Sequence, residues 1–344
     1  MTLVGTGEIV RPAARPGHGA EAGAAGRLPA VGVGVGAFNV VQLEHAEAIV
    51  TGAEAAGAPV VLQISENTAR YHGTLGPVAA ATLAVARAAR VPVAVHLDHA
   101  TCPELVQEAL DLGFTSVMFD GSALPYEENV AATAAVGARC HAAGVWVEAE
   151  LGEIGGKDGV HAPGARTDPD EAAAFVAATG VDALAVAVGT SHAMATRDAR
   201  LDFALIGALR TAVPVPLVLH GSSGVPDPDL TRAVAHGITK VNIATQLNRV
   251  FTGAARAVLD SDPALSDPRR YLGAGRTAMA HEVTRLLGVL GAGAAVSAAA
   301  DGAAADGAAA DGAAADGAAA DGAAADGAYW REPTAPARLA SPPA

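Results

Sequence analysis

The amino-acid sequence predicts an α/β fold: a (β/α)8 TIM barrel with a C-terminal helical extension and a disordered low-complexity tail. Between Val31 and Asp260, eight short β-branched runs alternate with eight alanine-rich stretches of helical character. The repeat averages about 28 residues, and the region has roughly the 250-residue length that such a barrel needs. A doubly wound open sheet is the structural alternative, but no Gly-x-Gly-x-x-Gly turn follows the first strand.

Each expected strand is a short run of β-branched and other apolar residues that precedes a helical stretch. The eight strands are expected at 31–38, 59–64, 92–97, 115–119, 145–149, 182–188, 215–219 and 238–242.

The expected helices carry recognisable start and stop signals. Thr101–Glu104 and Thr167–Asp170 each combine an N-cap residue type with an early proline. Five glycines fall near helix ends just before a strand, where a left-handed turn is wanted; they are Gly57, Gly113, Gly144, Gly180 and Gly237. The helices are expected at 42–56, 77–90, 103–112, 127–143, 168–178, 202–211, 228–236 and 245–258, with a further one at 275–289 that packs on the barrel or on a partner subunit.

The chain divides into three regions by composition. Residues 1–30 form an N-terminal segment with a flexible insert rich in Pro, Gly and Ala, and residues 31–292 form the barrel with its C-terminal helix. Residues 293–344 contain the repeat Ala-Ala-Ala-Asp-Gly and a Pro-rich end. Because glycine interrupts the alanines at every fifth position, we expect this tail to be disordered and to carry no chemistry. Deleting residues 296–344 is therefore expected to leave activity intact.

Composition excludes several classes of function. Aromatic residues make up 3% of the chain, and 22 Lys and Arg stand against 36 Asp and Glu, which argues against nucleic-acid binding. No uninterrupted apolar run reaches the roughly 18 residues of a membrane span, and the N-terminus lacks an apolar run of signal-peptide length. Two cysteines, Cys102 and Cys140, cannot form a disulfide framework, so we expect a cytoplasmic protein.

Acid–base and metal-ligand residue types gather at the C-terminal ends of the expected strands, which is where barrel enzymes carry their active sites. These segments are His96–His99, Asp120–Ser122, Glu148–Glu150, Gly189–His192, His220–Gly224 and Asn242–Thr245. Three histidines and an open position make a catalytic zinc site. The ligand candidates are His99, His192 and His220, whereas His96 shares the strand parity of Asp98 and is assigned to a supporting position or to the core.

The loops after the last two strands predict a phosphate site. Gly221–Gly224 is a glycine- and serine-rich turn, and Asn242–Thr245 leads into the start of a helix. Exposed backbone amides, hydroxyls and a helix N-terminus all favour an anion at this position of a barrel.

Zinc, a carboxylate and a phosphate site together suggest carbon–carbon bond chemistry on a sugar phosphate, because zinc polarises a ketone and stabilises an enediolate. Asp98 is the candidate that takes or returns the hydroxyl proton. On an ideal strand Asp98 and His99 face opposite ways. Both reach the site only if the chain leaves extended geometry there.

A set of motifs in a fixed order carries a family resemblance. The motifs are Ala37–Asn39, His96–His99, Ser116–Ser122, Val147–Gly152, Gly189–His192, Leu217–Gly224, Lys240–Thr245 and Asp267–Leu272. From about Val31 to Gly291 the sequence resembles the class II, zinc-dependent ketose-bisphosphate aldolases, in the branch that holds tagatose-bisphosphate and related aldolases.

The resemblance implies a role for each matching residue. Asp98 matches the catalytic acid/base, and His99, His192 and His220 match the zinc ligands. Asp120 and Glu150 match carboxylates that hold a second or displaced divalent metal ion. The residues expected to bind substrate, including its dihydroxyacetone-phosphate part, are Asn39, Ser65, Ala193, Gly221, Ser222, Ser223, Asn242, Ile243, Ala244 and Thr245.

The implied reaction is zinc-dependent reversible cleavage of tagatose or fructose 1,6-bisphosphate to dihydroxyacetone phosphate and an aldehyde such as glyceraldehyde 3-phosphate. Similar proteins are usually homodimers or homotetramers, and some use a monovalent cation near the phosphate. Arg269 is a candidate for a second phosphate, across a subunit interface. The chain departs from the pattern in having Ala193 in place of glycine and a lid loop, Gly155–Gly159, without the usual glutamate. Ala244, where fructose-bisphosphate-specific relatives tend to have aspartate, tilts the assignment away from a strictly glycolytic enzyme.

Four alternatives stay open. The barrel either acts by the same mechanism on another ketose phosphate, or binds a sugar phosphate without turnover. A Schiff-base aldolase needs an active lysine, and Lys157 and Lys240 are the only two lysines. A zinc hydrolase that activates water is the fourth.

Overall fold

The computed structural model describes residues 2–13, 32–151, 166–190 and 197–291, all within one compact unit that spans Met1–Gly302. His192, Ala193, the expected lid loop at 155–159, the insert at 14–30 and the low-complexity tail lie outside the described residues.

Eight parallel strands form a closed barrel in chain order, with the last strand paired to the first. This confirms the predicted fold class. The strands are β1 (Val35–Asn39), β2 (Val60–Ser65), β3 (Val93–Ala100), β4 (Ser116–Phe119), β5 (Trp146–Leu151), β6 (Ala183–Val186), β7 (Leu217–Leu219) and β8 (Ile238–Ile243).

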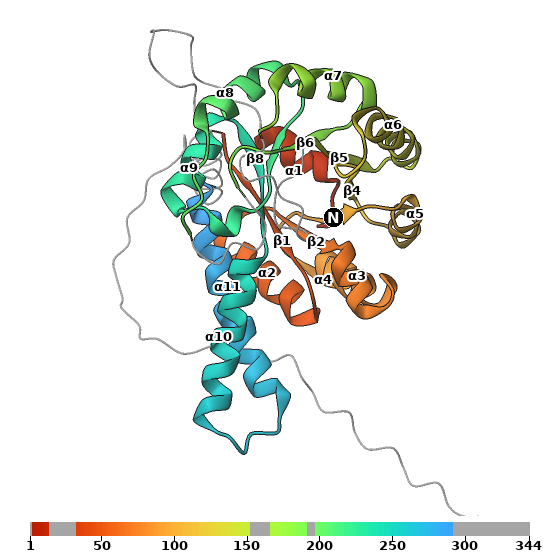
Figure 1. Cartoon of the computed structure of the whole chain (residues 1–344). Coiled ribbons are helices and arrows are strands. Elements are labelled where there is room, and N and C mark those ends of the chain that lie inside the picture. The colour runs from red at the N-terminus through yellow and green to blue at the C-terminus, as the bar shows by residue number, and fades with distance from the viewer. Residues whose placement is uncertain (1, 14–31, 152–165, 191–196, 292–344) are drawn as a thin grey trace, which may run out of the picture. The chain divides into compact units, whose positions relative to one another are not determined.

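Helices surround the barrel, and the last two extend together away from it (Figure 1). The described helices are α1 (Thr6–Ala13), α2 (Leu43–Ala56), α3 (Glu66–His72), α4 (Gly76–Ala88), α5 (Pro103–Leu112), α6 (Tyr126–Ala142), α7 (Pro169–Thr179), α8 (Phe203–Ala212), the 3-10 helix η1 (Ser222–Gly224), α9 (Asp227–His236), α10 (Thr245–Ser261) and α11 (Pro268–Val289).

All eight strands fall where the sequence predicts them, with two informative differences at their ends. The expected first strand begins at residue 31, but β1 begins at Val35 because the amide of Gly34 donates to the carbonyl oxygen of Leu290 in place of a neighbouring strand, at 2.9 Å. The third strand continues past Leu97 to Ala100, through an irregularity that matters for the site.

Three helical segments differ from expectation. α1 and α3 are absent from the predicted set, because both are short and α3 follows its strand without an intervening loop. α11 starts at Pro268, seven residues before the expected helix, and the side chain of Asp267 caps it by accepting from the amide of Arg269 at 3.0 Å.

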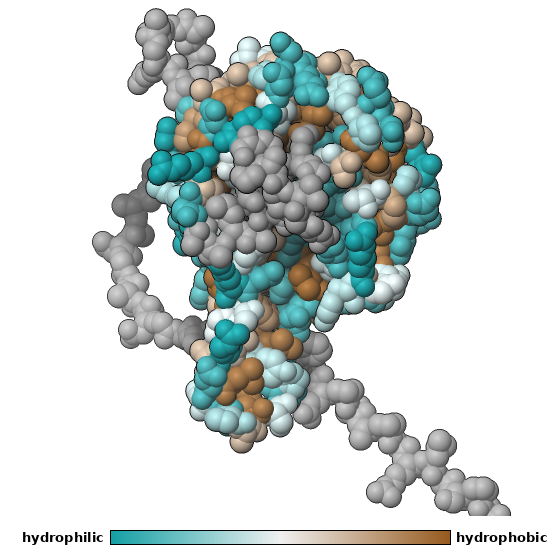
Figure 2. Space-filling view, in the orientation of Figure 1, coloured by the Kyte–Doolittle hydropathy of each residue, from teal (hydrophilic) through white to brown (hydrophobic). Residues whose placement is uncertain are grey.

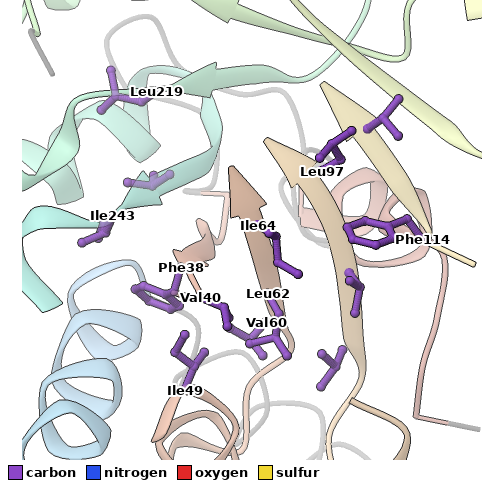
Figure 3. Packing of buried hydrophobic residues seen from close by; sticks show 14 of the residues in the cluster. Phe38, Val40, Ile49, Val60, Leu62, Ile64, Leu97, Phe114, Leu219 and Ile243 are labelled. Atoms are coloured by element: carbon purple, nitrogen blue, oxygen red, sulfur yellow. The ribbon is translucent and has the colours of Figure 1, made fainter. Parts of the chain in front are cut away.

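Outward-facing strand residues pack against the helices. Figure 3 shows Ile49 of α2 next to Val40 and Val60, and Leu62 and Ile64 follow on the same face of β2. α2 also lies very close to α11: a Cβ atom added at Gly52 would meet the carbonyl oxygen of Ala280 at 2.5 Å. Only glycine permits this approach, which fixes α11 against the barrel wall.

The barrel interior changes character along its axis. Its lower layers are apolar and include Val61, Ala94 and Met118, and α1 contributes Ile9 and Val10 to the same cluster at the end where the strands begin. The polar residues of the predicted site lie nearer the carboxyl ends of the strands, whereas Ser116, at the start of β4, is buried against Thr6 and His96. The functional residues predicted at the strand ends therefore lie above a packed apolar cluster inside the barrel.

No helix among the described residues is both long enough and apolar enough to cross a membrane.

Candidate active site

The irregularity in β3 brings two neighbouring residues to the same side. The pairing of β3 with β4 shifts between Leu97 and Ala100, and His99 has a φ of 53°, in the left-handed region. A bulge of this kind breaks the strict alternation of side chains along a strand. Asp98 and His99 therefore both line one cavity. The sequence predicts that both reach the site only if the chain leaves extended geometry at this point, and β3 does so.

His99 is held through one of its ring nitrogens. Its Nδ1 lies 2.8 Å from Oδ2 of Asp120, a carboxylate that can only accept, so Nδ1 carries the hydrogen and donates it. The lone pair of the imidazole is then on Nε2. Asp120 follows β4, and its Oδ1 accepts from the amide of Ser122 at 3.2 Å.

His220 is held in the opposite sense. Its Nε2 donates to Oε1 of Glu148 at 3.0 Å, and both side chains are buried inside the barrel. The lone pair of His220 is therefore on Nδ1. The second oxygen of Glu148 accepts from the ammonium of Lys240 at 2.8 Å, so the carboxylate has a cation on its far side.

The two lone pairs face each other. Nε2 of His99 lies 2.9 Å from Nδ1 of His220. Two such nitrogens repel at this distance unless a cation lies with them, and imidazoles whose other nitrogen is bonded to a carboxylate are typical zinc ligands. The donor set thus fits a zinc ion.

Two groups of residues in the described chain have ligand atoms within 4.8 Å of one another: Asp98, His99 and His220, and His99, Asp120 and Glu150. They share His99, so the described residues offer two adjoining places for a divalent ion. The first contains two of the three imidazoles of the expected zinc site, and the second contains the carboxylates expected for a second or displaced ion.

Asp98 is buried between two side-chain amides and the imidazole of His99. Its Oδ2 accepts from the Nδ2 amide of Asn39 at 3.0 Å, and its Oδ1 lies 3.4 Å from Nδ2 of Asn242. Burial alone raises the pKa of Asp98, but His99, His220 and Lys240 together with the Asn39 amide outweigh it and lower the pKa to about 2. The carboxylate is therefore ionised at neutral pH and ready to accept a proton.

A cavity of about 240 Å³ opens above these residues. One wall is the turn after β7, where Gly221 has a φ of 68° and the hydroxyl of Ser223 accepts from the amide of Gln246 at 3.2 Å. The N-terminus of α10 forms the adjoining wall, with Ala244 and Thr245. Backbone amides and the positive end of a helix dipole meet here, which favours an anion.

The sequence and the fold match the same family of enzymes. The model of the family Fructose-bisphosphate aldolase class-II matches residues 28–294. The chain is 42% identical over 249 residues to a fructose-bisphosphate aldolase of Geobacillus stearothermophilus, covering 71% of this chain and 87% of that relative. The chain belongs to the class II fructose-bisphosphate aldolase family.

Further comparisons agree with this family. A fructose-bisphosphate aldolase of Staphylococcus aureus (strain Mu50) is 40% identical over 256 residues, which cover 73% of this chain and 90% of the relative. The crystal structure of the YdjI aldolase from Escherichia coli K12 superposes with a TM-score of 0.64 at 32% identity, covering 76% of this chain and 92% of that one. The protein is thus an aldolase, a carbon–carbon lyase that cleaves a ketose bisphosphate.

Most residues predicted for the aldolase site line the cavity. They are Asn39, Ser65, Asp98, His99, His220, Gly221, Ser222, Ser223, Asn242, Ala244 and Thr245. Asp120 and Glu150 lie beside His99, with Glu150 Oε2 3.8 Å from its Nδ1. Ile243 differs: it is 1% exposed and packs in the hydrophobic core, because its side chain faces the opposite side of β8 from Asn242. His192 and Ala193 lie outside the described residues.

The aldolase site also contains Gln63, which was not predicted from the sequence. Gln63 lines the cavity, and its Nε2 amide donates to Oδ1 of Asn39 at 2.6 Å. The signal in the sequence was that Gln63 is a polar residue within the apolar run 59–64 and shares the strand parity of Ser65.

Lys240 is 1% exposed and paired with Glu148. A buried, ion-paired ammonium is a poor nucleophile, which argues against Lys240 as a Schiff-base lysine.

Proposed function

We propose that this aldolase catalyses the zinc-dependent, reversible cleavage of fructose or tagatose 1,6-bisphosphate to dihydroxyacetone phosphate and glyceraldehyde 3-phosphate. The observation that carries the proposal is the pair of imidazole nitrogens, Nε2 of His99 and Nδ1 of His220, that face each other 2.9 Å apart beside Asp98. Relatives named fructose-bisphosphate aldolase at about 40% identity support a ketose 1,6-bisphosphate.

His99 and His220, with His192 as the third, are the proposed zinc ligands. When bound, zinc supplies a Lewis acid that polarises the ketone and stabilises the negative charge left when the carbon–carbon bond breaks. Asp120 and Glu148 hold the ligand imidazoles in the tautomers whose lone pairs are on Nε2 of His99 and Nδ1 of His220. Asp120 and Glu150 are the proposed residues for a second or displaced divalent ion.

Asp98 is the proposed acid/base. In the cleavage direction its carboxylate takes the proton of the C4 hydroxyl as the C3–C4 bond breaks, and in the condensation direction it returns that proton. Asn39 fixes the carboxylate by donating to Oδ2 at 3.0 Å, and Gln63 in turn orients Asn39. The reacting oxygen of Asp98 is thus held by a chain of amides that reaches across β1 and β2.

The phosphate of the dihydroxyacetone-phosphate half is proposed to bind at Gly221, Ser222 and Ser223 and at the N-terminus of α10. The left-handed turn at Gly221 lines the cavity together with Ser222 and Ser223, and the helix end adds its positive dipole. Asn39, Ser65, Asn242, Ala244 and Thr245, which line the cavity, complete the proposed substrate site, and Ala193 is the proposed contact from the loop after β6. The monovalent cation near this phosphate stays a prediction.

We propose a homodimer or homotetramer in which the helix pair α10–α11 contributes to the interface. Figure 2 shows apolar surface on this pair, and Leu259 on α10 is 40% exposed. Arg269 at the start of α11 is the proposed ligand for the second phosphate, across that interface. Light scattering should give a dimer or tetramer for the wild type and a smaller species for Leu259→Glu, and a monomeric wild type would contradict the proposal.

The test of the function is cleavage of fructose 1,6-bisphosphate and tagatose 1,6-bisphosphate, coupled to detection of dihydroxyacetone phosphate. It compares metal-free enzyme, enzyme with zinc restored, and His220→Ala. Release that depends on zinc and is lost in His220→Ala supports the proposal, and the ratio of the two rates assigns the substrate. Zinc binding without release from either sugar would contradict it.

A further inference from the structure

His99 holds a backbone conformation that its residue type rarely adopts. Its φ of 53° is in the left-handed region, and every other described residue with a positive φ is a glycine. A histidine stays in this conformation only when its surroundings hold it there. The contacts that fix the chain next to His99 therefore determine where its imidazole points.

Two contacts fix the chain directly after His99. The carbonyl oxygen of Ala100 accepts from the amide of Asp120 at 2.8 Å, which ties the bulge to β4. On the other side, the amide of Thr101 donates to Oε2 of Glu66 at 2.6 Å. The hydroxyl of Thr101 lies 3.0 Å and 3.1 Å from the two oxygens of the same carboxylate.

Glu66 makes these contacts from a different element. It is the first residue of α3, directly after β2, and it is 7% exposed although it is a carboxylate. Its neighbours Ser65 and Asn67 line the cavity, whereas Glu66 is absent from the lining and reaches across to the end of β3. A buried carboxylate is stable only with donors, and here Thr101, on the segment that carries His99, donates alongside Arg70 of the same helix.

We propose that Glu66 is a positioning residue of the zinc site. By holding Thr101, its carboxylate keeps the bulge of β3 in place and His99 in the left-handed conformation, so that Nε2 of His99 faces Nδ1 of His220. The inference rests on the proposed function, in which His99 binds zinc. It links the cavity wall of β2 and α3 to a metal ligand on β3.

Arg70 provides a matched control. It lies one turn after Glu66 in α3 and forms an ion pair with Oε1, but its side chain is 65% exposed. Its removal leaves both carboxylate oxygens able to accept from Thr101. If the carboxylate acts as an acceptor for Thr101, Arg70→Ala should leave zinc binding within about threefold of the wild type, because Thr101 keeps both of its contacts with Glu66.

The experiment measures the dissociation constant for Zn²⁺ alone, on the full chain, by competition with a chromophoric chelator. Glu66→Ala is expected to weaken zinc binding about tenfold, the lower end of the effect of removing a group that orients a ligand histidine. Glu66→Gln retains an oxygen acceptor for the Thr101 amide and should stay within about threefold of the wild type. Equal zinc affinity of Glu66→Ala and the wild type would overturn the inference.

A melting temperature with and without zinc separates positioning from a purely structural role. Positioning predicts that the rise in Tm on adding zinc is smaller in Glu66→Ala than in the wild type, because that rise follows affinity. A lower Tm of the zinc-free variant with an undiminished rise overturns the inference. If the alanine variant does not fold, Glu66→Asp decides in the same way, since its shorter side chain cannot keep the contact with Thr101.

His99→Ala distinguishes failure of the inference from failure of the proposed function. If wild type and His99→Ala bind zinc equally, His99 is not a ligand and both fail. If His99→Ala loses zinc while Glu66→Ala and Glu66→Asp bind as the wild type does, only the role of Glu66 fails.

Discussion

Nε2 of His99 and Nδ1 of His220 face each other at 2.9 Å, and each imidazole is held at its other nitrogen by a carboxylate, Asp120 for the first and Glu148 for the second. His99 is in β3 and His220 directly follows β7, and these two strands are not neighbours in the barrel. Their tautomers are set by carboxylates of other strands, since Asp120 follows β4 and Glu148 is in β5. Asp120 holds this pair directly, and Lys240 acts on it through Glu148.

Asp120 is expected to control zinc affinity through His99. In Asp120→Ala, Nδ1 of His99 loses its acceptor and the imidazole can adopt the other tautomer, so zinc binding should weaken by about 10- to 100-fold. Calorimetric titration with zinc measures this. A loss of binding stoichiometry with unchanged affinity would show instead that Asp120 holds a second ion and does not orient His99.

Lys240 is expected to contribute stability by neutralising Glu148. Lys240→Met leaves a buried carboxylate without its cation, which typically costs about 3–5 kcal/mol in the free energy of unfolding. The double variant Glu148→Gln, Lys240→Met should recover most of this loss because it removes the uncompensated charge as well. Urea unfolding of the zinc-free protein measures both.

The matched control for Lys240 is the surface pair of Arg90 and Glu54, in which the arginine side chain is 82% exposed. Arg90→Ala should change the free energy of unfolding by less than about 1 kcal/mol. A double variant as unstable as Lys240→Met would contradict the assignment of the loss to the unpaired carboxylate.

The pH dependence of the reaction should not follow the ionisation of Asp98. Its pKa of about 2 is below the ordinary value, so it stays ionised as pH falls through the range where histidines take up protons. An acid limb of kcat/KM above pH 4 is therefore expected to report protonation of histidines. The stability that the lowered pKa provides is present above pH 4 and is lost only as pH falls toward 2.

Asp98→Asn checks the role of this carboxylate directly. It should lower kcat by about 100- to 10,000-fold, the usual contribution of a general base, while zinc affinity stays near that of the wild type. Initial rates and zinc titration on the same preparation measure the two. Retained kcat in the asparagine variant would contradict the acid/base assignment.

The sequence predicts the barrel and most of its rim because both follow from local periodicity. Each strand is a short apolar run, and Asp98, His220 and Asn242 mark strand ends by their residue type alone. Ile243 shows the limit of this approach. It belongs to the same motif as Asn242, yet it faces the core, since the alternation of a strand separates neighbours within a motif.

What the sequence does not predict depends on contacts between distant segments. The bulge that brings His99 beside Asp98 is held by Glu66, 35 residues before Thr101, and by the pairing with β4. The ion pair of Lys240 and Glu148 joins β8 to β5 across the interior. Because strand order and register decide such contacts, the residue types alone leave them open.

His45 is expected to reduce stability in mild acid. It is buried in α2 against Phe251, and its Nδ1 accepts from the amide of Val41 at 3.3 Å, which requires the neutral ring. Burial lowers the pKa of His45 from 6.5 to about 4. The unfolded chain therefore takes up a proton near pH 6.5 that the folded chain does not accept until about pH 4, so stability falls as pH decreases through this window.

The size of this effect follows from the two pKa values. Between pH 7.5 and pH 5, His45 should account for a loss of about 2 kcal/mol in the free energy of unfolding. In His45→Asn, whose side-chain oxygen can still accept from the Val41 amide, the loss between the two pH values should be smaller by that amount. The control is His72→Asn, because His72 is exposed and contacts the carbonyl oxygen of the same Val41. Urea unfolding at both pH values measures the loss in the free energy of unfolding for wild type, His45→Asn and His72→Asn, and His72→Asn should lose as much as the wild type. An equal loss in wild type and His45→Asn would show that His45 does not titrate as its burial requires.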